Sequence, residues 1–154
     1  GLLEHAPGKE VADGLLLVTP ALGAVDPLAR FAGVLKYLVP ATPSIGNDIA
    51  KEGVDEGAYD MTPVAGVHEL HKLWADVRSC LDLVTCPIAL FRSEVDNVVP
   101  GSSSDTVLRL VSSDDITEVR LANSYHVATL DHDANLIVKT SLQFIERVAA
   151  AHTA

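Results

Sequence analysis

Asp96 and His126 are the two residues whose types and surroundings best suit catalysis. Asp96 follows the apolar run at 88–91, and His126 lies in a polar loop just after the alternating run at 116–121. Catalytic groups of parallel sheets sit at the carboxyl ends of the strands, so both side chains are expected at one edge of a sheet. A histidine acts as a general base near neutral pH, and a buried acid orients its ring and stabilises the imidazolium. The two residues are therefore candidates for two of the three members of a hydrolytic triad.

Each candidate also has a purely structural interpretation. Asp96 precedes the Val-Val-Pro segment at 98–100, where an aspartate commonly forms a turn. His126 can equally be a loop histidine bonded to the backbone. Glu94 is a rival for the acid role, but it comes earlier in the turn, and Asp96 is favoured. The third triad member is missing, because the Gly-x-Ser-x-Gly elbow that exposes a nucleophilic serine does not occur in the 154 residues.

The remaining serines lack the surroundings of a nucleophile. Ser102, Ser103 and Ser104 follow the acid turn and favour a solvated helix start, with Ser102 or Ser103 as the N-cap. Ser124 and Ser141 have no elbow around them. We therefore assign no nucleophile within the chain.

Metal and disulfide chemistry receive little support from the sequence. His68 and His71 are three residues apart, which is not the His-Glu-x-x-His spacing of zinc proteases, and no cysteine or carboxylate cluster is nearby. We expect no metal and no cofactor. His132 is expected on the surface. Cys80 and Cys86 favour two reduced, largely buried thiols of a cytosolic protein.

The composition fits one globular domain. The chain is 48% hydrophobic and 21% charged, so it can bury a core. Its net charge of -10, without a lysine and arginine cluster, disfavours nucleic acid and anionic membrane surfaces. No apolar run approaches the roughly 18 residues that a membrane span needs.

The apolar patterns predict strands that alternate with helices, which indicates a parallel α/β sheet. The expected strands cover 14–19, 88–92 and 116–121, and the expected helices cover 27–39, 63–83, 103–111 and a last segment from about Asp133. Residues 1–13 suggest the tail of a further helix, and 41–63 an irregular excursion.

Three of these helices are expected to bury an apolar stripe. The stripe of 27–39 is Leu28, Phe31, Leu35 and Leu38, and that of 63–83 is Val67, Leu70, Trp74, Val77 and Leu81. The stripe of the last helix is Val138, Leu142, Ile145 and Ala149, with Val148 beside it. The run at 14–19 is apolar throughout, which suits a strand covered on both faces.

The residues around the two candidates resemble the C-terminal half of α/β-hydrolases, in particular the carboxylesterase and monoacylglycerol-lipase-like group. Segment 93–100, SEVDNVVP, resembles the Ser-x-x-Asp-x-Val-Val-Pro turn that carries this group's triad acid. Segment 124–131, SYHVATLD, resembles the loop that carries its triad histidine. One departure is Asn97, where family members often have a histidine that is not a triad member.

Further segments extend the resemblance over nearly the whole chain. Residues 59–63 and 73–74 look like the lid region of the group, and 19–22 resembles the strand that follows the nucleophile's helix. This lid makes His71 a candidate for lining an acyl pocket beneath it. The implied fold class is α/β, a partial α/β-hydrolase with the C-terminal strands of a mostly parallel sheet and a helical lid insert. Residues 1–23 and 84–154 would form the C-terminal part of the core, and 24–83 the lid or cap.

The resemblance implies a cytoplasmic serine hydrolase that cleaves carboxylic esters through a Ser-Asp-His triad, to which this chain contributes Asp96 and His126. Segment 1–3 resembles the residues just after the family's nucleophile elbow, so the nucleophile and the oxyanion-hole donors are expected outside the chain. The chain alone is therefore expected to be inactive.

The implied partners are a small-molecule ester and, through the exposed edge of the 14–19 strand, an N-terminal companion segment or a second copy. Neither nucleic acid nor a membrane span is expected. Two alternatives stay open. One is a non-catalytic fragment or binding and assembly module on half a hydrolase fold, and the other is a hydrolase acting on a lactone or a C–C bond.

Overall fold

The protein is described by a computed structural model that covers residues 12–152. Its centre is a sheet of three strands, β1 (Leu15–Val18), β4 (Ile88–Ser93) and β5 (Ile116–Leu121), in the order β1-β4-β5. Both strand pairs are parallel, with Leu15 opposite Ile88 and Ile88 opposite Ile116. The three predicted strands and the parallel α/β class are therefore confirmed. The helix tail expected at 1–13 falls almost wholly outside the described residues.

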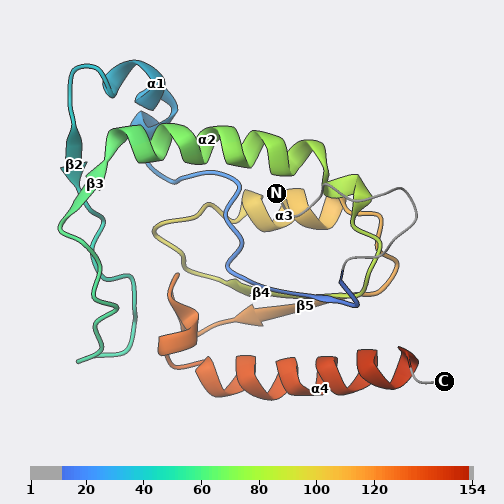
Figure 1. Ribbon diagram of the computed structural model, residues 1–154. Helices are drawn as coiled ribbons and strands as arrows, with labels where there is room; N and C mark the ends of the chain where they lie inside the picture. The colour runs from blue at the N-terminus through green and yellow to red at the C-terminus, as the bar shows by residue number, and fades with distance from the viewer. Residues whose placement is uncertain (1–11, 153–154) are drawn as a thin grey trace.

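Helices cover the sheet on two sides and give three layers (Figure 1). Helix α2 (Val64–Ser79) and helix α3 (Ser102–Leu110) lie on one face, and α4 (Ala134–His152) lies on the other. The central strand β4 is buried on both sides, and residues 88–91 are 0% exposed. Two covered faces explain why this strand is continuously apolar instead of alternating.

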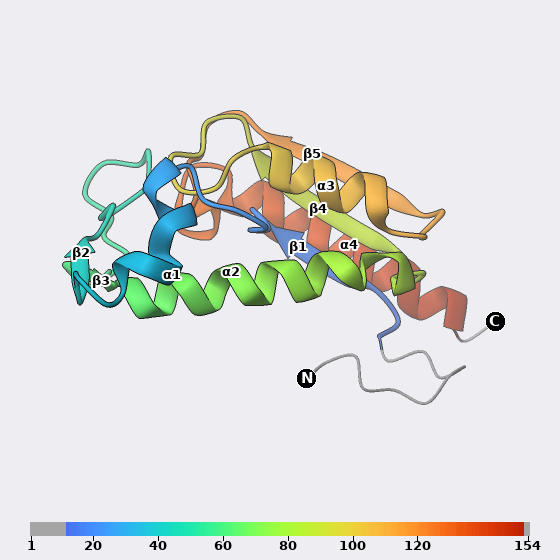
Figure 2. The same ribbon diagram turned by 90° about the horizontal axis from the view of Figure 1, so that it is seen from above.

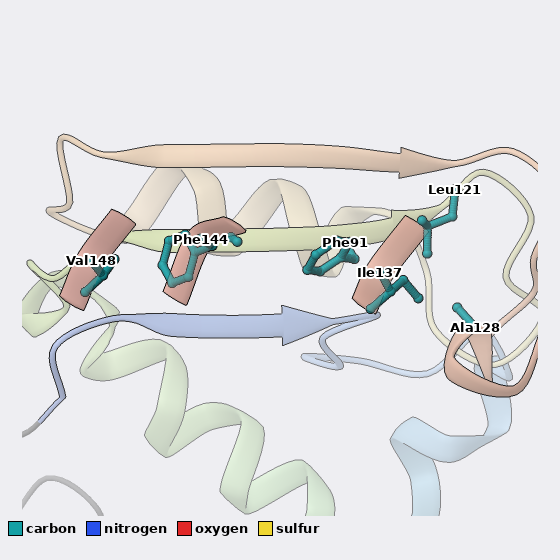
Figure 3. Close-up of a cluster of buried hydrophobic side chains, with 7 residues drawn as sticks. Phe91, Leu121, Ala128, Ile137, Phe144 and Val148 are labelled. Atoms are coloured by element: carbon teal, nitrogen blue, oxygen red, sulfur yellow. The ribbon is translucent and has the colours of Figure 1, made fainter. Parts of the chain in front are cut away.

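Alternate residues of β4 enter two separate cores. Ala89 and Phe91 pack toward α4 with Leu121, Ile137, Phe144 and Val148, as Figure 3 shows for the labelled side chains. Ile88 and Leu90 pack toward the other face, in a cluster completed by Leu22, Trp74, Leu81 and Val107. The side chains of successive strand residues point in opposite directions, which divides one apolar run between two layers.

The stripe predicted for the last helix is wrong. Ile137, Phe144 and Val148 face the sheet, whereas Val138 is 58%, Leu142 56% and Ile145 50% exposed. The helix has apolar residues on more than half of its circumference, so periodicity did not decide which of them packs. The contact with β4 selected the row that includes the bulky Phe144.

The insert between β1 and β4 is less helical than predicted. It begins with a 3₁₀ turn, η1 (Pro27–Phe31), and a single helical turn, α1 (Ala32–Leu35), in place of a helix over 27–39. The expected excursion contains two short antiparallel strands, β2 (Ala41–Pro43) and β3 (Met61–Pro63). Figure 2 shows α1, β2 and β3 gathered at one end of α2.

The apolar stripes of the insert are only partly buried. Leu28 is 61% and Leu38 75% exposed, because α1 packs on α2 through its small residues, and a Cβ at Gly33 would lie 3.2 Å from the His68 ring. On α2, Trp74 is buried but Leu70 is 45% exposed. The short turn η2 (Leu81–Leu83) ends this helical segment and buries Leu81.

Strand β1 forms one edge of the sheet. Within residues 12–152 it pairs only with β4, and Leu16 is 39% exposed, so the prediction of a strand covered on both faces is wrong. An open depression of about 610 Å³ lies between this edge and α4, lined among others by Gly14, Leu16 and Ile145. The exposed edge expected from the sequence is present.

Candidate active site

Asp96 and His126 lie in the loops that follow β4 and β5. The two strands are parallel neighbours, with Ser93 opposite Leu121 at their ends. Both loops therefore leave the sheet at the same edge, the side of the molecule where the insert with β2 and β3 lies (Figure 1). Residues that are 30 positions apart in the sequence meet because Asp96 lies three residues beyond the end of β4 and His126 five residues beyond the end of β5.

The structure brings the two side chains into direct contact. The His126 Nδ1 atom lies 2.9 Å from Asp96 Oδ2, and the side chains are 26% and 10% exposed respectively. This is the arrangement in which an acid holds the ring with Nδ1 protonated and leaves Nε2 to exchange a proton with a substrate. Among residues 12–152, no serine hydroxyl is hydrogen-bonded to the ring.

The other oxygen of Asp96 serves the turn. Oδ1 accepts hydrogen bonds from the backbone N–H groups of Val98, at 2.9 Å, and Val99, at 2.7 Å. The structural and the catalytic interpretation of Asp96 are thus compatible, since each uses a different oxygen. Glu94, the rival acid, is exposed, and its backbone N–H bonds to the Leu121 carbonyl.

The pair shifts the titration of both members. The Asp96 carboxylate raises the pKa of His126 above its ordinary 6.5, against the opposite effect of burial. Burial raises the pKa of Asp96, but the hydrogen bonds from His126, Val99 and Val98 outweigh it and hold this pKa below 3.8. Asp96 therefore stays ionised through the neutral range and favours the protonated imidazole.

The histidine loop is held at its backbone by two hydroxyl groups. Thr19, at the end of β1, donates from Oγ1 to the His126 carbonyl at 3.0 Å, and Ser93, at the end of β4, donates to the Tyr125 carbonyl at 2.7 Å. Thr19 has a φ of 43°, in the left-handed region that is unusual for a β-branched residue. All three strands thus contribute to the placement of one loop.

Two buried carboxylates join the insert to the same loops, and sequence reasoning missed both. Asp48 is 5% exposed and binds the backbone N–H groups of Asn97 and His126. Asp131 is 2% exposed and binds four backbone N–H groups, those of Ala50, Lys51, Tyr125 and His132.

The serine predictions near the acid turn are wrong in two respects. The N-cap of α3 is Gly101, and neither Ser102 nor Ser103 makes a capping bond. Ser103 and Ser104 are buried, at 3% and 5% exposure, instead of solvated. Ser103 Oγ accepts a hydrogen bond from the Leu22 N–H across 3.1 Å, so this serine fastens α3 to the chain that leaves β1.

Another serine that sequence reasoning set aside is also structural. Ser124 is 2% exposed, accepts from the Asp133 N–H and donates to the Asp133 carboxylate. Its hydroxyl is fully engaged at the start of α4. Its hydroxyl proton is therefore bound to Asp133 and is not available to His126.

The remaining candidates lie away from this site. His71 packs edge-to-face on Trp74 with the ring centroids 4.9 Å apart, and His132 is exposed as expected. Cys80 and Cys86 form no disulfide and are of intermediate burial, which is less than the sequence suggested. Over the described residues, no cluster of three histidine, cysteine, aspartate or glutamate side chains is placed to hold a metal ion. The same part of the chain contains no helix long and apolar enough to cross a bilayer.

Two curated proteins resemble the chain in sequence, although no protein-family model matches it. A thermostable monoacylglycerol lipase of Bacillus sp. strain H-257 is 39% identical over 154 residues, which cover 96% of this chain and 58% of the lipase. A carboxylesterase of Bacillus subtilis strain 168 is 25% identical over 118 residues, which cover 77% of this chain and 48% of the esterase. The chain thus spans about half the length of the curated relatives it matches.

Solved structures with the same fold include further lipolytic enzymes. One of two metagenome-derived lipolytic enzymes superposes with a TM-score of 0.83 at 35% identity, covering 88% of this chain and 55% of the enzyme. The monoacylglycerol lipase of Paleococcus ferrophilus superposes with a TM-score of 0.66 over 89% of this chain and 58% of the lipase. At 16% identity, the second likeness supports the fold alone.

Proposed function

The chain is a C-terminal portion of an α/β-hydrolase with lipase and esterase homologues, and on this premise we propose that it supplies the acid and the base of a serine esterase. The observation that carries the proposal is the 2.9 Å contact between Asp96 Oδ2 and His126 Nδ1 at the carboxyl edge of the parallel sheet. The nucleophilic serine comes from a part of the fold outside the 154 residues, which contain no Gly-x-Ser-x-Gly.

In the proposed reaction, His126 Nε2 takes the proton of the serine hydroxyl as its oxygen attacks the ester carbonyl carbon. The imidazolium then gives this proton to the leaving alcohol, and an acyl-enzyme remains. Water attacks the acyl-enzyme with His126 again as the base, which releases the carboxylic acid. Asp96 stays ionised throughout, keeps Nδ1 protonated and stabilises the imidazolium.

The proposed substrates are carboxylic esters of short or medium acyl chains, including monoacylglycerols. Residues 24–83 are proposed as the cap that supplies the acyl pocket, in which His71 is a candidate lining residue. The position of the insert beside the carboxyl ends of the strands supports this role (Figure 1). The absence of a disulfide between Cys80 and Cys86 fits the cytoplasmic location predicted from the sequence.

The test compares two histidines of one loop in the product of the complete reading frame. His126→Ala is expected to lower the turnover of p-nitrophenyl butyrate by about 10⁴-fold or more. His132→Ala, an exposed neighbour, is the matched control and is expected to leave turnover unchanged. If His126→Ala hydrolyses the ester at the normal rate, the assignment is wrong.

A second candidate is a non-catalytic assembly module. It is favoured by the open edge of β1 with its exposed Leu16, a surface that can pair with a further strand. The polypeptide of residues 1–154 by itself is expected to show no ester hydrolysis, since it lacks a nucleophile. Activity of this polypeptide would overturn the claim that the nucleophile lies outside the chain.

A further inference from the structure

We propose that Asp48 is a positioning residue that fixes the acid loop and the histidine loop relative to each other, an inference that rests on the triad proposed above. Asp48 belongs to the irregular loop between β2 and β3, in the insert, and not to the sheet. Its carboxylate is nevertheless one of the least exposed in the described part of the chain, at 5%. The closest contacts of this carboxylate are with Asn97 and His126.

The hydrogen bonds of Asp48 connect both loops to one side chain. Oδ2 accepts from the backbone N–H of Asn97 at 3.2 Å and from the backbone N–H of His126 at 3.0 Å. Oδ1 accepts from the side-chain amide of Asn97 at 2.7 Å. The Asp48 carbonyl accepts from the Val127 N–H at 3.2 Å. Asn97 directly follows Asp96, so one carboxylate binds the neighbour of the acid and the base itself.

This arrangement resists movement of either loop. A buried carboxylate is strongly unfavourable unless hydrogen bonds compensate for its lost hydration. Displacing the Asn97 or the His126 backbone removes such a bond and leaves the Asp48 charge undersatisfied. The contact between Asp96 and His126 is a single hydrogen bond between two loops, and Asp48 limits how far these loops can separate. A displacement of about 1 Å in a catalytic group costs on the order of 10²-fold in rate.

The charge of Asp48 acts in the same direction as its hydrogen bonds. The hydrogen bond to Asp96 is the main cause of the raised pKa of His126, and the charges of Asp96, Asp48 and Glu56 add to it. Burial of the ring has the opposite effect. A test of positioning must therefore separate the hydrogen bonds of Asp48 from its charge.

Two substitutions make this separation. Asp48→Ala removes the charge and all three side-chain bonds. In Asp48→Asn the amide oxygen can accept both backbone N–H groups, while the Asn97 amide, turned by half a rotation, accepts from the new NH₂ group. The pattern of hydrogen bonds is then retained without the charge. Val107→Ala is the stability control, because Val107 of α3 is 3% exposed, packs in the core cluster with Ile88 and Leu90, and makes no hydrogen bond to Asp48 through its side chain.

The first measurement is the kinetics of ester hydrolysis by the product of the complete reading frame. Asp48→Ala is expected to lower kcat by about 10- to 100-fold with little change in KM, as expected for lost alignment. Asp48→Asn is expected to stay near the wild-type kcat. The inference is overturned if Asp48→Ala behaves like Val107→Ala, or if Asp48→Asn loses as much activity as Asp48→Ala.

The second measurement does not depend on activity. Proton NMR is expected to show a low-field Nδ1–H resonance of His126, assigned by its absence in His126→Gln. This resonance should persist in Asp48→Asn, with a lowered His126 pKa, and disappear in Asp48→Ala. If His126→Ala is fully active, the proposed triad is wrong and this resonance alone decides the positioning role. A resonance that persists in Asp48→Ala refutes it.

Discussion

The substitution Asp131→Asn gives a sharp test of how the insert is fastened to the histidine loop. Oδ2 of Asp131 accepts from the N–H groups of Ala50, at 2.7 Å, and Tyr125, at 2.9 Å. Oδ1 accepts from those of Lys51, at 2.9 Å, and His132, at 2.8 Å. An asparagine has one amide oxygen, so its NH₂ group must face two of these four donors. Two partly buried N–H groups then lose their acceptor.

The expected cost follows from this count. An unsatisfied buried donor costs about 1–3 kcal/mol, and partly buried donors lie at the lower end of this range, so Asp131→Asn should lower the free energy of unfolding by about 2 kcal/mol. That is a large share of the roughly 5–15 kcal/mol typical of a domain. In a domain of this size, it corresponds to a fall in Tm of about 4–8 °C. Urea unfolding monitored by circular dichroism at pH 7, with a thermal scan, measures both quantities.

The matched control is Asp115→Asn. Asp115 also binds a donor, Arg147, but the two side chains are 43% and 49% exposed. An exposed ion pair contributes about 1 kcal/mol or less. A loss for Asp131→Asn no larger than that of Asp115→Asn would refute the reasoning.

Acid titration supplies a second check of the same substitution. Burial raises the pKa of Asp131, and the four backbone N–H groups outweigh this and hold the pKa below 3.8. A carboxyl whose pKa falls on folding stabilises the protein above its unfolded pKa, and this contribution is lost as the pH falls through the folded pKa. The difference between wild type and Asp131→Asn should therefore be full at pH 7 and shrink below about pH 3.8. A difference that stays constant into acid would contradict the role given to the charge.

Two further substitutions test single contacts of the site. Ser103→Ala removes the acceptor of the buried Leu22 N–H and should cost about 1–3 kcal/mol in urea unfolding, whereas Ser102→Ala, at an exposed position, should be neutral; equal effects would exclude the contact. Asp96→Asn should lower the pKa of His126 in an NMR titration, because the hydrogen bond to the Asp96 carboxylate is the main reason that this pKa is raised. Folding raises the pKa of His126, so the protonated ring stabilises the folded protein below pH 6.5, and this contribution is lost as the pH rises through the pKa of the folded state. Asp96→Asn should therefore lower the free energy of unfolding most in mild acid. An unchanged pKa of His126 in this variant would count against the pairing.

The pairing of Asp96 with His126 could be predicted because its causes are local. Each residue follows a run of strand-forming residues, and parallel strands bring their carboxyl ends to one edge. The contact distance of 2.9 Å and the low exposure of Asp96 came only from the structure. The catalytic role of the pair is the part that the proposed substitutions test.

Asp48 and Asp131 could not have been found in the same way. Both bind mainly backbone N–H groups, and every residue except proline has one, so no sequence pattern marks the partners. Asp131 binds Ala50 across 81 positions in the sequence, and Asp48 binds His126 across 78. The signal that was available is the polar composition of 41–63, which indicated an irregular segment. It did not indicate the strands β2 and β3 at its two ends, nor its hydrogen bonds to the acid and histidine loops.

The three strands, their parallel arrangement and the positions of Asp96 and His126 beyond β4 and β5 could be predicted from the sequence. These depend on apolar runs and turn residues, which act over a few positions. Only the tertiary structure decided that Phe144 and not Leu142 packs on the sheet, that Ser103 is buried, and that Asp48 joins the acid loop to the histidine loop. Those outcomes depend on which distant groups satisfy buried polar atoms and fill the core, and such long-range complementarity leaves no local pattern.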